Sequence, residues 1–296
     1  MRCDGSSGAP TPRARPGQAS GSLGFAGAVL QALPEHGGCG ACEDLPEANR
    51  SGPTSNAGAT RAPMIIMHID PRLELVERFF SGTGTTYDLI VNLCTLGVDR
   101  LWKKRILQQL SAPRRAMDLA CGTGILTLAM ARRFPQCQVV GVELREEYLA
   151  IAREKAKDLG ISNVEFILSR AEDVALSQEF DCITSSYLAK YADLKPLVRN
   201  MTRMLRPKGM LLFHDFTYPT NPIWAACWEF YFKLLRKFGT RKYPQWKNVF
   251  HELPELVRRT PWVNDLRFAM EESGLRQIET TYMIFNSSAI ITGTKA

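Results

Sequence analysis

The sequence has few of the features that mark metal-binding or membrane-spanning proteins. Cys39 and Cys42 are spaced like a pair of metal ligands, but the chain contains no second pair of this kind, and a structural zinc site needs further ligands. The aromatic run at 224–235 is interrupted by Glu229 and Lys233, and it is too short to cross a bilayer. The 8 cysteines are scattered, which is typical of reduced thiols and not of a disulfide framework.

A short apolar segment followed by a glycine turn is the most informative feature that is present. Residues 116–120 show no polar alternation, which predicts a short buried strand. Gly122 and Gly124 permit a tight turn and bring backbone N–H groups close to a ligand. Helical spacing of apolar residues follows at 125–134, and Glu143 ends the next apolar run. This order is a nucleotide-binding arrangement, because the acid can accept hydrogen bonds from ribose hydroxyls.

The glycine turn lacks the third glycine of a dinucleotide-binding fingerprint, since Thr127 stands at that position. Asp118, four residues before Gly122, would lie unfavourably beside a pyrophosphate. A carboxylate there suits a ligand that carries an ammonium and no phosphate, and S-adenosyl-L-methionine is such a ligand. The alternative is an ordinary tight turn in an α/β protein, but Asp118 and Glu143 together favour the cofactor.

Residues 1–63 differ in composition from the rest of the chain. They are rich in Gly, Ala, Ser, Pro and Arg and have no sustained periodicity, which predicts a disordered, low-complexity extension. The apolar patch at 23–33 faintly resembles a targeting segment, but nearby acidic residues argue against a transit peptide. A simpler account is a mis-assigned start, with the natural one at Met64 or Met67.

The remaining chain alternates predicted strands and helices. Beyond the first two strands, we expect strands at 164–168, 180–185, 210–216, 277–285 and 288–293. Helical patterns at 146–159 and 194–205 separate the early strands, and 206–209 (Arg-Pro-Lys-Gly) is expected to break the chain. The alternation predicts an α/β domain at 113–296, with a mostly parallel sheet between helices, preceded by a helical leader at 64–112.

Several polar segments follow the predicted strands directly. Ligands of such sheets lie at the carboxyl ends of the strands, near the topological switch point. The predicted order brings five segments to that edge: 118–124, Glu143, 169–173, 185–187 and Asp215. Their convergence supports a ligand site more strongly than any single motif does.

The net charge of +7 comes from clustered basic residues. One cluster lies at 100–105 and a second at 233–247, directly after the aromatic run. Such clusters can bind nucleic acid or anionic lipid, although solvated helix faces also carry them. The run at 224–235 suits an interfacial amphipathic helix, a lid over an apolar substrate, or a buried helix, and these alternatives stay open here.

Two further segments resemble the signatures of one enzyme family. Residues 87–103 contain Tyr-Asp-Leu-Ile-Val-Asn and Gly-Val-Asp-Arg-Leu-Trp-Lys, and they resemble the N-terminal signature of the ubiquinone/menaquinone biosynthesis C-methyltransferases (UbiE-like). Residues 203–216 resemble the second signature. The likeness runs from about Phe79 to Thr294 and extends to class I S-adenosyl-L-methionine-dependent methyltransferases. It implies a Rossmann-like fold with a seven-stranded sheet, and methyl transfer to a ring carbon of a prenylated quinol. Reduced, buried thiols fit a cytoplasmic protein. A prenylated quinol partitions into membrane, and the aromatic run with the basic stretch after it suits peripheral contact with an anionic membrane surface.

The resemblance also implies roles for single residues. Thr123 would contact the cofactor, and Glu143 would bind its ribose. Arg170 and Ala171 would lie along the adenine, and Ser186 would lie near the methionyl end. The complete set of expected cofactor-binding residues is Asp118, Ala120, Gly122, Thr123, Gly124, Glu143, Leu144, Arg170, Ala171, Glu172 and Ser186.

The chain departs from the family pattern at several positions. Asp99 stands where members usually have His, and Arg170 stands where they have Asn or Asp. Glu172 or Asp173 would then recognise the adenine N6 instead. The segment at 219–262 is longer and more aromatic than the family pattern. Most of these departures are on the substrate side, so they bear on the acceptor more than on the cofactor.

Methylation of a ring carbon needs a base, because removal of a phenolic proton pushes electron density onto the carbon beside it. Asp215 and His214 are candidates at the end of the fifth strand, and Tyr87 or Asp88 in the leader. His214 and Asp215 point to opposite faces of the sheet, so we expect only one in the cleft, and the family-matched position favours Asp215. Arg100 could stabilise the phenolate. Each of these side chains could instead make a structural hydrogen bond.

Three other functions are compatible with parts of the sequence. A methyltransferase for a phenol, sterol or lipid amine would have the same glycine turn. A nucleic-acid methyltransferase is disfavoured, because 184–187 contains no Pro where exocyclic-amine enzymes carry one, and no Pro-Cys dipeptide occurs for pyrimidine C5 chemistry. A non-catalytic sensor or scaffold that binds S-adenosyl-L-methionine would also keep the turn and the acid. We expect no metal ion, and the sequence predicts no oligomeric state.

Overall fold

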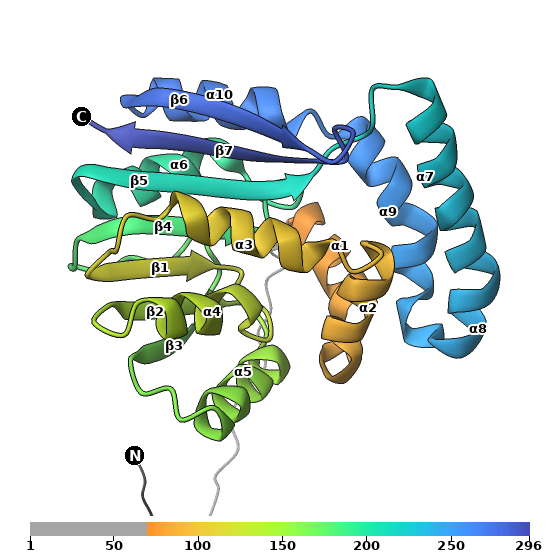
Figure 1. Ribbon diagram of the computed structural model, residues 1–296, viewed down its shortest axis with the longest axis horizontal. Helices are drawn as coiled ribbons and strands as arrows, with labels where there is room; N and C mark the ends of the chain where they lie inside the picture. Colours follow the sequence, from red (N-terminus) through yellow and green to blue (C-terminus); the bar gives the residue numbers. More distant parts are fainter. Residues whose placement is uncertain (1–69) are drawn as a thin grey trace, which may run out of the picture. The chain divides into compact units, whose positions relative to one another are not determined.

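The structure is a computed structural model that describes residues 70–296. The predicted extension at 1–63, the alternative starts at Met64 and Met67, and the pair Cys39 and Cys42 lie outside the described residues. The described chain begins with leader helices and continues through an α/β sheet. Further helices lie between the fifth and sixth strands (Figure 1).

Seven strands form one sheet in the order β3-β2-β1-β4-β5-β7-β6. They are β1 (Arg115–Leu119), β2 (Gln138–Glu143), β3 (Val164–Leu168), β4 (Phe180–Ser186), β5 (Leu205–Phe216), β6 (Leu275–Met283) and β7 (Ser288–Lys295). Strands β1 to β5 are parallel, and β7 is antiparallel to β5 and β6. The predicted mostly parallel, seven-stranded sheet is therefore confirmed. The strand order reverses between β1 and β4, which is the switch point where ligands bind in such folds.

Helices precede, connect and follow the strands. They are α1 (Pro71–Phe80), α2 (Tyr87–Cys94), α3 (Asp99–Gln109), α4 (Ile125–Arg133), α5 (Glu146–Asp158), α6 (Leu194–Met204), α7 (Pro222–Leu234), α8 (Thr240–Lys242), α9 (Lys247–Arg259) and α10 (Trp262–Glu272). The Asp70 carboxylate caps α1 by accepting a hydrogen bond from the N–H of Arg72 (3.0 Å). Asn221 caps α7 through the N–H of Ile223 (2.9 Å). A proline follows each capping residue, so the local sequence determines where both helices begin.

Side chains alternate between two apolar cores, one on each face of the sheet. Met117 and Leu119 point into the core formed with α6 and α10, whereas Ala116 points into the core formed with α3 and α4. Helix α5 comes close to the start of α4, since a Cβ added to Gly124, the N-cap of α4, would lie 3.2 Å from the Cβ of Ala152. Helices α1 and α2 lie at the carboxyl edge of the parallel strands (Figure 1).

A third apolar core lies beside the sheet and joins the leader to the segment after β5. Phe79 of α1 and Ile90 of α2 pack with Phe232 of α7 and Phe250 of α9. The structure describes all residues of α7, and Phe232 is the only one of them that is buried. The aromatic run at 224–235 therefore lies mostly on the surface. Within residues 70–296, no helix has both the length and the apolar character that crossing a membrane requires.

Residues 206–209 differ from the prediction, because they lie inside β5 and do not break the chain. Strand β4 pairs with Leu205 before this segment and with Met210 after it, and the register shifts between the two. Lys208 has a φ of +64°, and an added Cβ on Gly209 would lie 2.8 Å from a backbone oxygen. The proline and glycine thus form a bulge within a longer strand.

Candidate functional site

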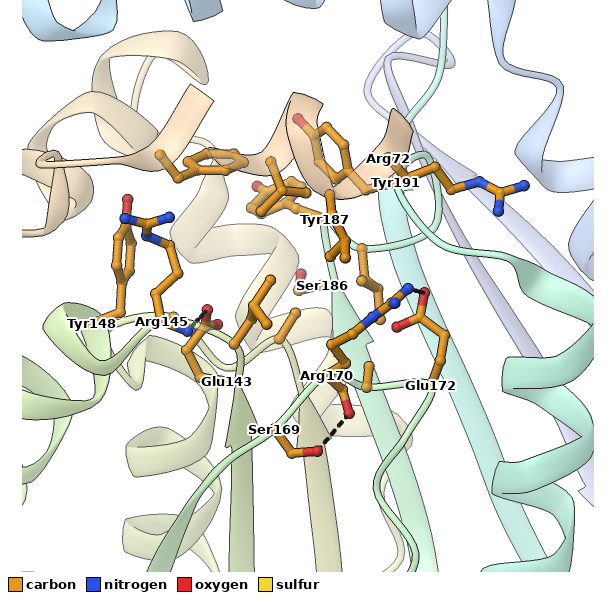
Figure 2. Close-up of a pocket in the computed structure, with 18 of the residues that line it drawn as sticks. Arg72, Glu143, Arg145, Tyr148, Ser169, Arg170, Glu172, Ser186, Tyr187 and Tyr191 are labelled. Carbon is orange, nitrogen blue, oxygen red and sulfur yellow. Dashed lines mark hydrogen bonds and ion pairs between the residues drawn. The ribbon is translucent and has the colours of Figure 1, made fainter. Parts of the chain in front are cut away.

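A cleft opens at the carboxyl edge of the sheet, between the ends of β1 to β4 and helix α1. Figure 2 shows Glu143, Ser169 and Ser186 at the strand ends, facing α1. Of the predicted cofactor-binding residues, those that line the cleft are Ala120, Gly122, Glu143, Leu144, Arg170, Ala171, Glu172 and Ser186. Tyr87, a candidate catalytic residue, lines it as well. The structure therefore brings together most of the segments that the sequence places at this edge.

The Glu143 carboxylate holds the glycine turn against the end of β2. It accepts hydrogen bonds from the backbone N–H groups of Gly122 (2.9 Å) and Arg145 (3.1 Å). Burial raises the pKa of Glu143. A carboxylate has about four acceptor positions, so this side chain can still receive hydroxyl groups from a ligand in the cleft.

Asp118, Thr123 and Gly124 do not line this cleft, in contrast to the prediction. The buried Asp118 carboxylate accepts hydrogen bonds from the hydroxyls of Thr127 (2.6 Å) and Thr184 (2.9 Å), and it lines a small adjoining cavity. Burial raises the pKa of Asp118 to about 6. The Thr123 hydroxyl donates a hydrogen bond to the carboxylate of Asp88 in α2. Both side chains are thus engaged inside the protein, and their contact with the cofactor stays a prediction.

Arg170 connects the sheet to the leader at the other end of the cleft. Its guanidinium lies 3.0 Å from the Asp70 carboxylate and 3.7 Å from that of Glu172. The Ser169 hydroxyl donates to the backbone oxygen of Arg170 (3.0 Å), as Figure 2 shows. Arg170 therefore fixes the start of α1 over the segment that carries Ala171 and Glu172.

A buried polar cluster lies behind Ser186. The Lys103 ammonium donates to the Ser186 hydroxyl (2.6 Å) and lies 3.1 Å from the Asp99 carboxylate. The Tyr187 phenol also donates to Asp99 (2.5 Å), and its backbone has a φ of +70°, which is strained for an aromatic residue. Sequence reasoning missed Lys103, and it placed Tyr187 at this edge only as part of 185–187. The four-residue spacing of Asp99 and Lys103 on a helix was the available signal.

His214 and Asp215 point to opposite faces of the sheet, as strand alternation predicts. His214 Nδ1 lies 2.8 Å from the Ser186 hydroxyl, and its ring lies 5.3 Å from that of Trp102. Burial lowers the pKa of His214 well below its usual range, so the imidazole is neutral. Neither side chain lines the cleft, and the expectation that Asp215 reaches it is not met.

An aromatic cavity adjoins the cleft. The residues that line both are Phe80, Tyr87, Tyr187 and Tyr191. Lys190 lines the aromatic cavity, and its ammonium lies 5.4 Å from the ring centroid of Phe216. The same ammonium forms a buried ion pair with Asp215. Burial lowers the pKa of Lys190, and the Asp215 carboxylate opposes that shift. Asp215 thus reaches this cavity only through Lys190, a residue that sequence reasoning missed.

Arg100 does not take part in either cavity. It lies on the exposed side of α3, whereas Asp99 and Lys103 are buried. Consecutive helical residues are rotated by about 100°, so a face that buries Asp99 and Lys103 turns Arg100 toward solvent. The predicted role of Arg100 at a phenolate is therefore not supported.

Comparison with protein families gives a match over nearly all of the described chain. The model of the ubiE/COQ5 methyltransferase family matches residues 69–295. The ubiquinone/menaquinone biosynthesis C-methyltransferase UbiE of Photorhabdus laumondii is 32% identical over 233 residues, which cover 76% of this chain and 92% of that protein. The demethylmenaquinone methyltransferase of Staphylococcus carnosus is 25% identical over 211 residues, which cover 70% of this chain and 87% of that protein.

Solved structures share the fold. The pyocyanin biosynthetic protein PhzM aligns with a TM-score of 0.53 and 15% sequence identity, covering 75% of this chain and 61% of that chain. The aligned part is less than two thirds of PhzM. At this identity the likeness concerns the arrangement of strands and helices.

Proposed function

The chain belongs to the ubiE/COQ5 methyltransferase family, and we propose that it methylates a ring carbon of a prenylated quinol. Membership confirms the resemblance seen in residues 87–103 and 203–216. The protein is an S-adenosyl-L-methionine-dependent C-methyltransferase. One observation carries the proposal for the acceptor: the cleft shares an aromatic wall with a second cavity that contains a buried lysine.

The residues of the cleft fit S-adenosyl-L-methionine. Gly122 has a φ of +57°, a backbone conformation that favours glycine, and its backbone lines the cleft. Glu143 would receive the ribose hydroxyls, Ala171 would lie along the adenine, and Ser186 would face the methionyl end. When bound, the sulfonium supplies an activated methyl group, so the protein mainly has to align donor and acceptor.

The aromatic cavity suits the flat ring of the acceptor. Tyr187 and Tyr191 line both the cavity and the cleft. An acceptor ring held in the cavity against these two side chains would therefore lie next to the cofactor site. The quinol would give its phenolic proton to solvent, and the Lys190 ammonium would stabilise the phenolate that remains. The proton that the methyl group displaces from the ring carbon would also pass to solvent. Asp215 positions Lys190 and does not touch the acceptor. Tyr87 lines both cavities, and it would contact donor and acceptor alike.

A double variant tests this assignment, because removal of Lys190 alone would leave the buried Asp215 unpaired. We expect Lys190→Met with Asp215→Asn to lower kcat for quinol methylation about 100-fold or more. Binding of S-adenosyl-L-methionine, measured by calorimetry, should stay unchanged. Lys195→Met is the control, because Lys195 pairs with Glu272 on the surface. An unchanged kcat in the double variant would contradict the role of Lys190.

The surface next to α7 suits contact with a membrane that holds such a quinol. Ile223, Phe230 and Phe238 are 70%, 61% and 56% exposed, and basic residues lie beside them at 233–242. Exposed apolar and basic side chains together favour anionic lipid surfaces. We expect the protein to float with anionic liposomes at low salt and Phe230→Glu with Phe238→Glu to abolish flotation. Failure of the unaltered protein to bind would contradict this proposal.

A further inference from the structure

An apolar groove lies between the leader and α7, outside both cavities described above. It has a volume of about 230 Å³ and is lined mostly by aromatic and aliphatic side chains, among them Trp102 and Phe216, and Trp224 and Trp228 of α7. No step of the proposed reaction takes place in this groove.

The wall of the groove offers little to a polar ligand. The Tyr231 hydroxyl donates to the backbone oxygen of Leu93 (2.5 Å), and the Thr95 hydroxyl donates to that of Val91 (2.7 Å). Both hydroxyls are thus engaged by the protein itself. Free cysteine thiols such as Cys227 behave as small apolar groups. The indole N–H of Trp102 is buried without a hydrogen-bond partner, but most of the lining is apolar, which suits an apolar ligand.

The groove adjoins the acceptor cavity. Cys94 and Phe216 line both, so these two side chains form part of the wall that the two spaces share. The acceptor cavity in turn shares its aromatic wall with the cofactor cleft. The three spaces therefore follow one another from the cofactor site, through the acceptor cavity, to α7.

Exposed apolar side chains also line the groove. Leu96 is 71% exposed, and Phe285, in the turn between β6 and β7, is 55% exposed. Phe285 stacks on Trp224 with ring centroids 3.7 Å apart, which ties that turn to α7. Ile284 and Phe285 have φ values of +43° and +54°, an unusual backbone conformation for such residues. Strained residues of this kind persist where the surrounding structure holds them, and they often lie at ligand sites.

We infer that this groove binds the isoprenoid tail of the acceptor, with the first isoprene units beside Phe216 and the later ones leaving past Trp224 and Phe285. The inference rests on the proposed function, since it assigns a site for one part of the proposed substrate. The groove mouth lies at the same helix as the proposed membrane contact. A tail threaded in this way could remain partly in the bilayer while the ring is methylated.

Binding can be tested without any reaction, because Cys227 lines the groove and is exposed. The probe is geranylgeraniol, an isoprenoid alcohol with no quinol ring. We expect a saturating amount to slow alkylation of Cys227, followed by peptide mass spectrometry, at least fivefold. A tail-free quinol should give no protection. An unchanged alkylation rate with geranylgeraniol would overturn the inference, whatever the protein methylates.

Kinetics test the same site during turnover. Cys227→Phe would fill the groove, whereas Ala226→Phe places the same bulk on the neighbouring exposed position, which does not line it. For a reduced acceptor with a geranylgeranyl tail, we expect Cys227→Phe to raise KM at least tenfold. The KM for a tail-free acceptor should stay unchanged, and Ala226→Phe should change neither value. Equal KM values for tailed and tail-free acceptors in the unaltered protein would overturn the inference and leave the proposed reaction standing. Methylation of neither acceptor would instead contradict the proposed function.

Discussion

Removal of the Asp215 carboxylate should destabilise the protein strongly. The Lys190 and Asp215 side chains are 2% and 0% exposed and form an ion pair. Asp215→Asn keeps the shape of the side chain but leaves the Lys190 ammonium buried without its counter-charge. Breaking a buried pair in this way costs about 3–5 kcal/mol. Urea unfolding at about pH 7 should therefore show a loss of this size in the free energy of unfolding.

The pH dependence of this loss gives a second check. Burial lowers the pKa of Lys190, and Asp215 opposes that shift, so Asp215→Asn lowers this pKa further. Between the lowered pKa and the unfolded value of about 10.4, the unfolded chain binds more protons than the native state. Stability of the variant should then rise with pH in that window, and its deficit relative to the unaltered protein should shrink.

A matched pair on the surface is the control for this experiment. Lys195 and Glu272 lie 3.1 Å apart, with side chains 57% and 45% exposed. Glu272→Gln should cost about 0–1 kcal/mol, because water already solvates both charges. Equal losses in Asp215→Asn and Glu272→Gln, or a deficit in Asp215→Asn that does not change with pH, would refute the reasoning.

Three other predictions concern the cleft and the sheet. Glu143→Gln should weaken binding of S-adenosyl-L-methionine about tenfold in calorimetry, because an amide accepts ribose hydroxyls less well than a carboxylate; unchanged affinity would speak against the ribose role. Gly209→Ala should lower the free energy of unfolding by about 1–3 kcal/mol, since the added Cβ would lie 2.8 Å from a backbone oxygen; a neutral effect would mean that the β5 bulge relaxes easily. The lowered pKa of His214 means that the unfolded chain binds the extra proton, so stability should fall as the pH drops below about 6.5. His214→Gln should flatten this fall, and an equal slope in both proteins would contradict it.

Much of the fold could be predicted because its signals are local. Continuous apolar runs such as 139–142 fit strands covered by helices on both faces, and this run lies within β2. The segment at 206–209 could not be predicted in the same way. Pro and Gly usually end an element, whereas here β4 pairs with β5 on both sides of them. Only the three-dimensional neighbours decide between a bulge and a turn.

The site was predictable where function follows from position at a strand end. Glu143 and Ser186 end β2 and β4, and both line the cleft. Lys103 and Lys190 were missed because a lysine is usually exposed, and sequence alone does not show which few are buried beside a carboxylate. Arg100 was a poor choice for a related reason. Asp99 and Lys103 lie on the buried face of α3, and Arg100 lies outside that face.

Methyl transfer to a reduced quinol tests the central claim most directly. S-adenosyl-L-methionine with an isotopically labelled methyl group would be incubated with the protein and short-tailed demethylmenaquinol or a demethylated ubiquinol precursor. The product would be analysed by nuclear magnetic resonance. We predict a labelled methyl group bound to a ring carbon. A methyl group on oxygen, or a protein that binds the cofactor and labels neither quinol, would contradict the proposed acceptor.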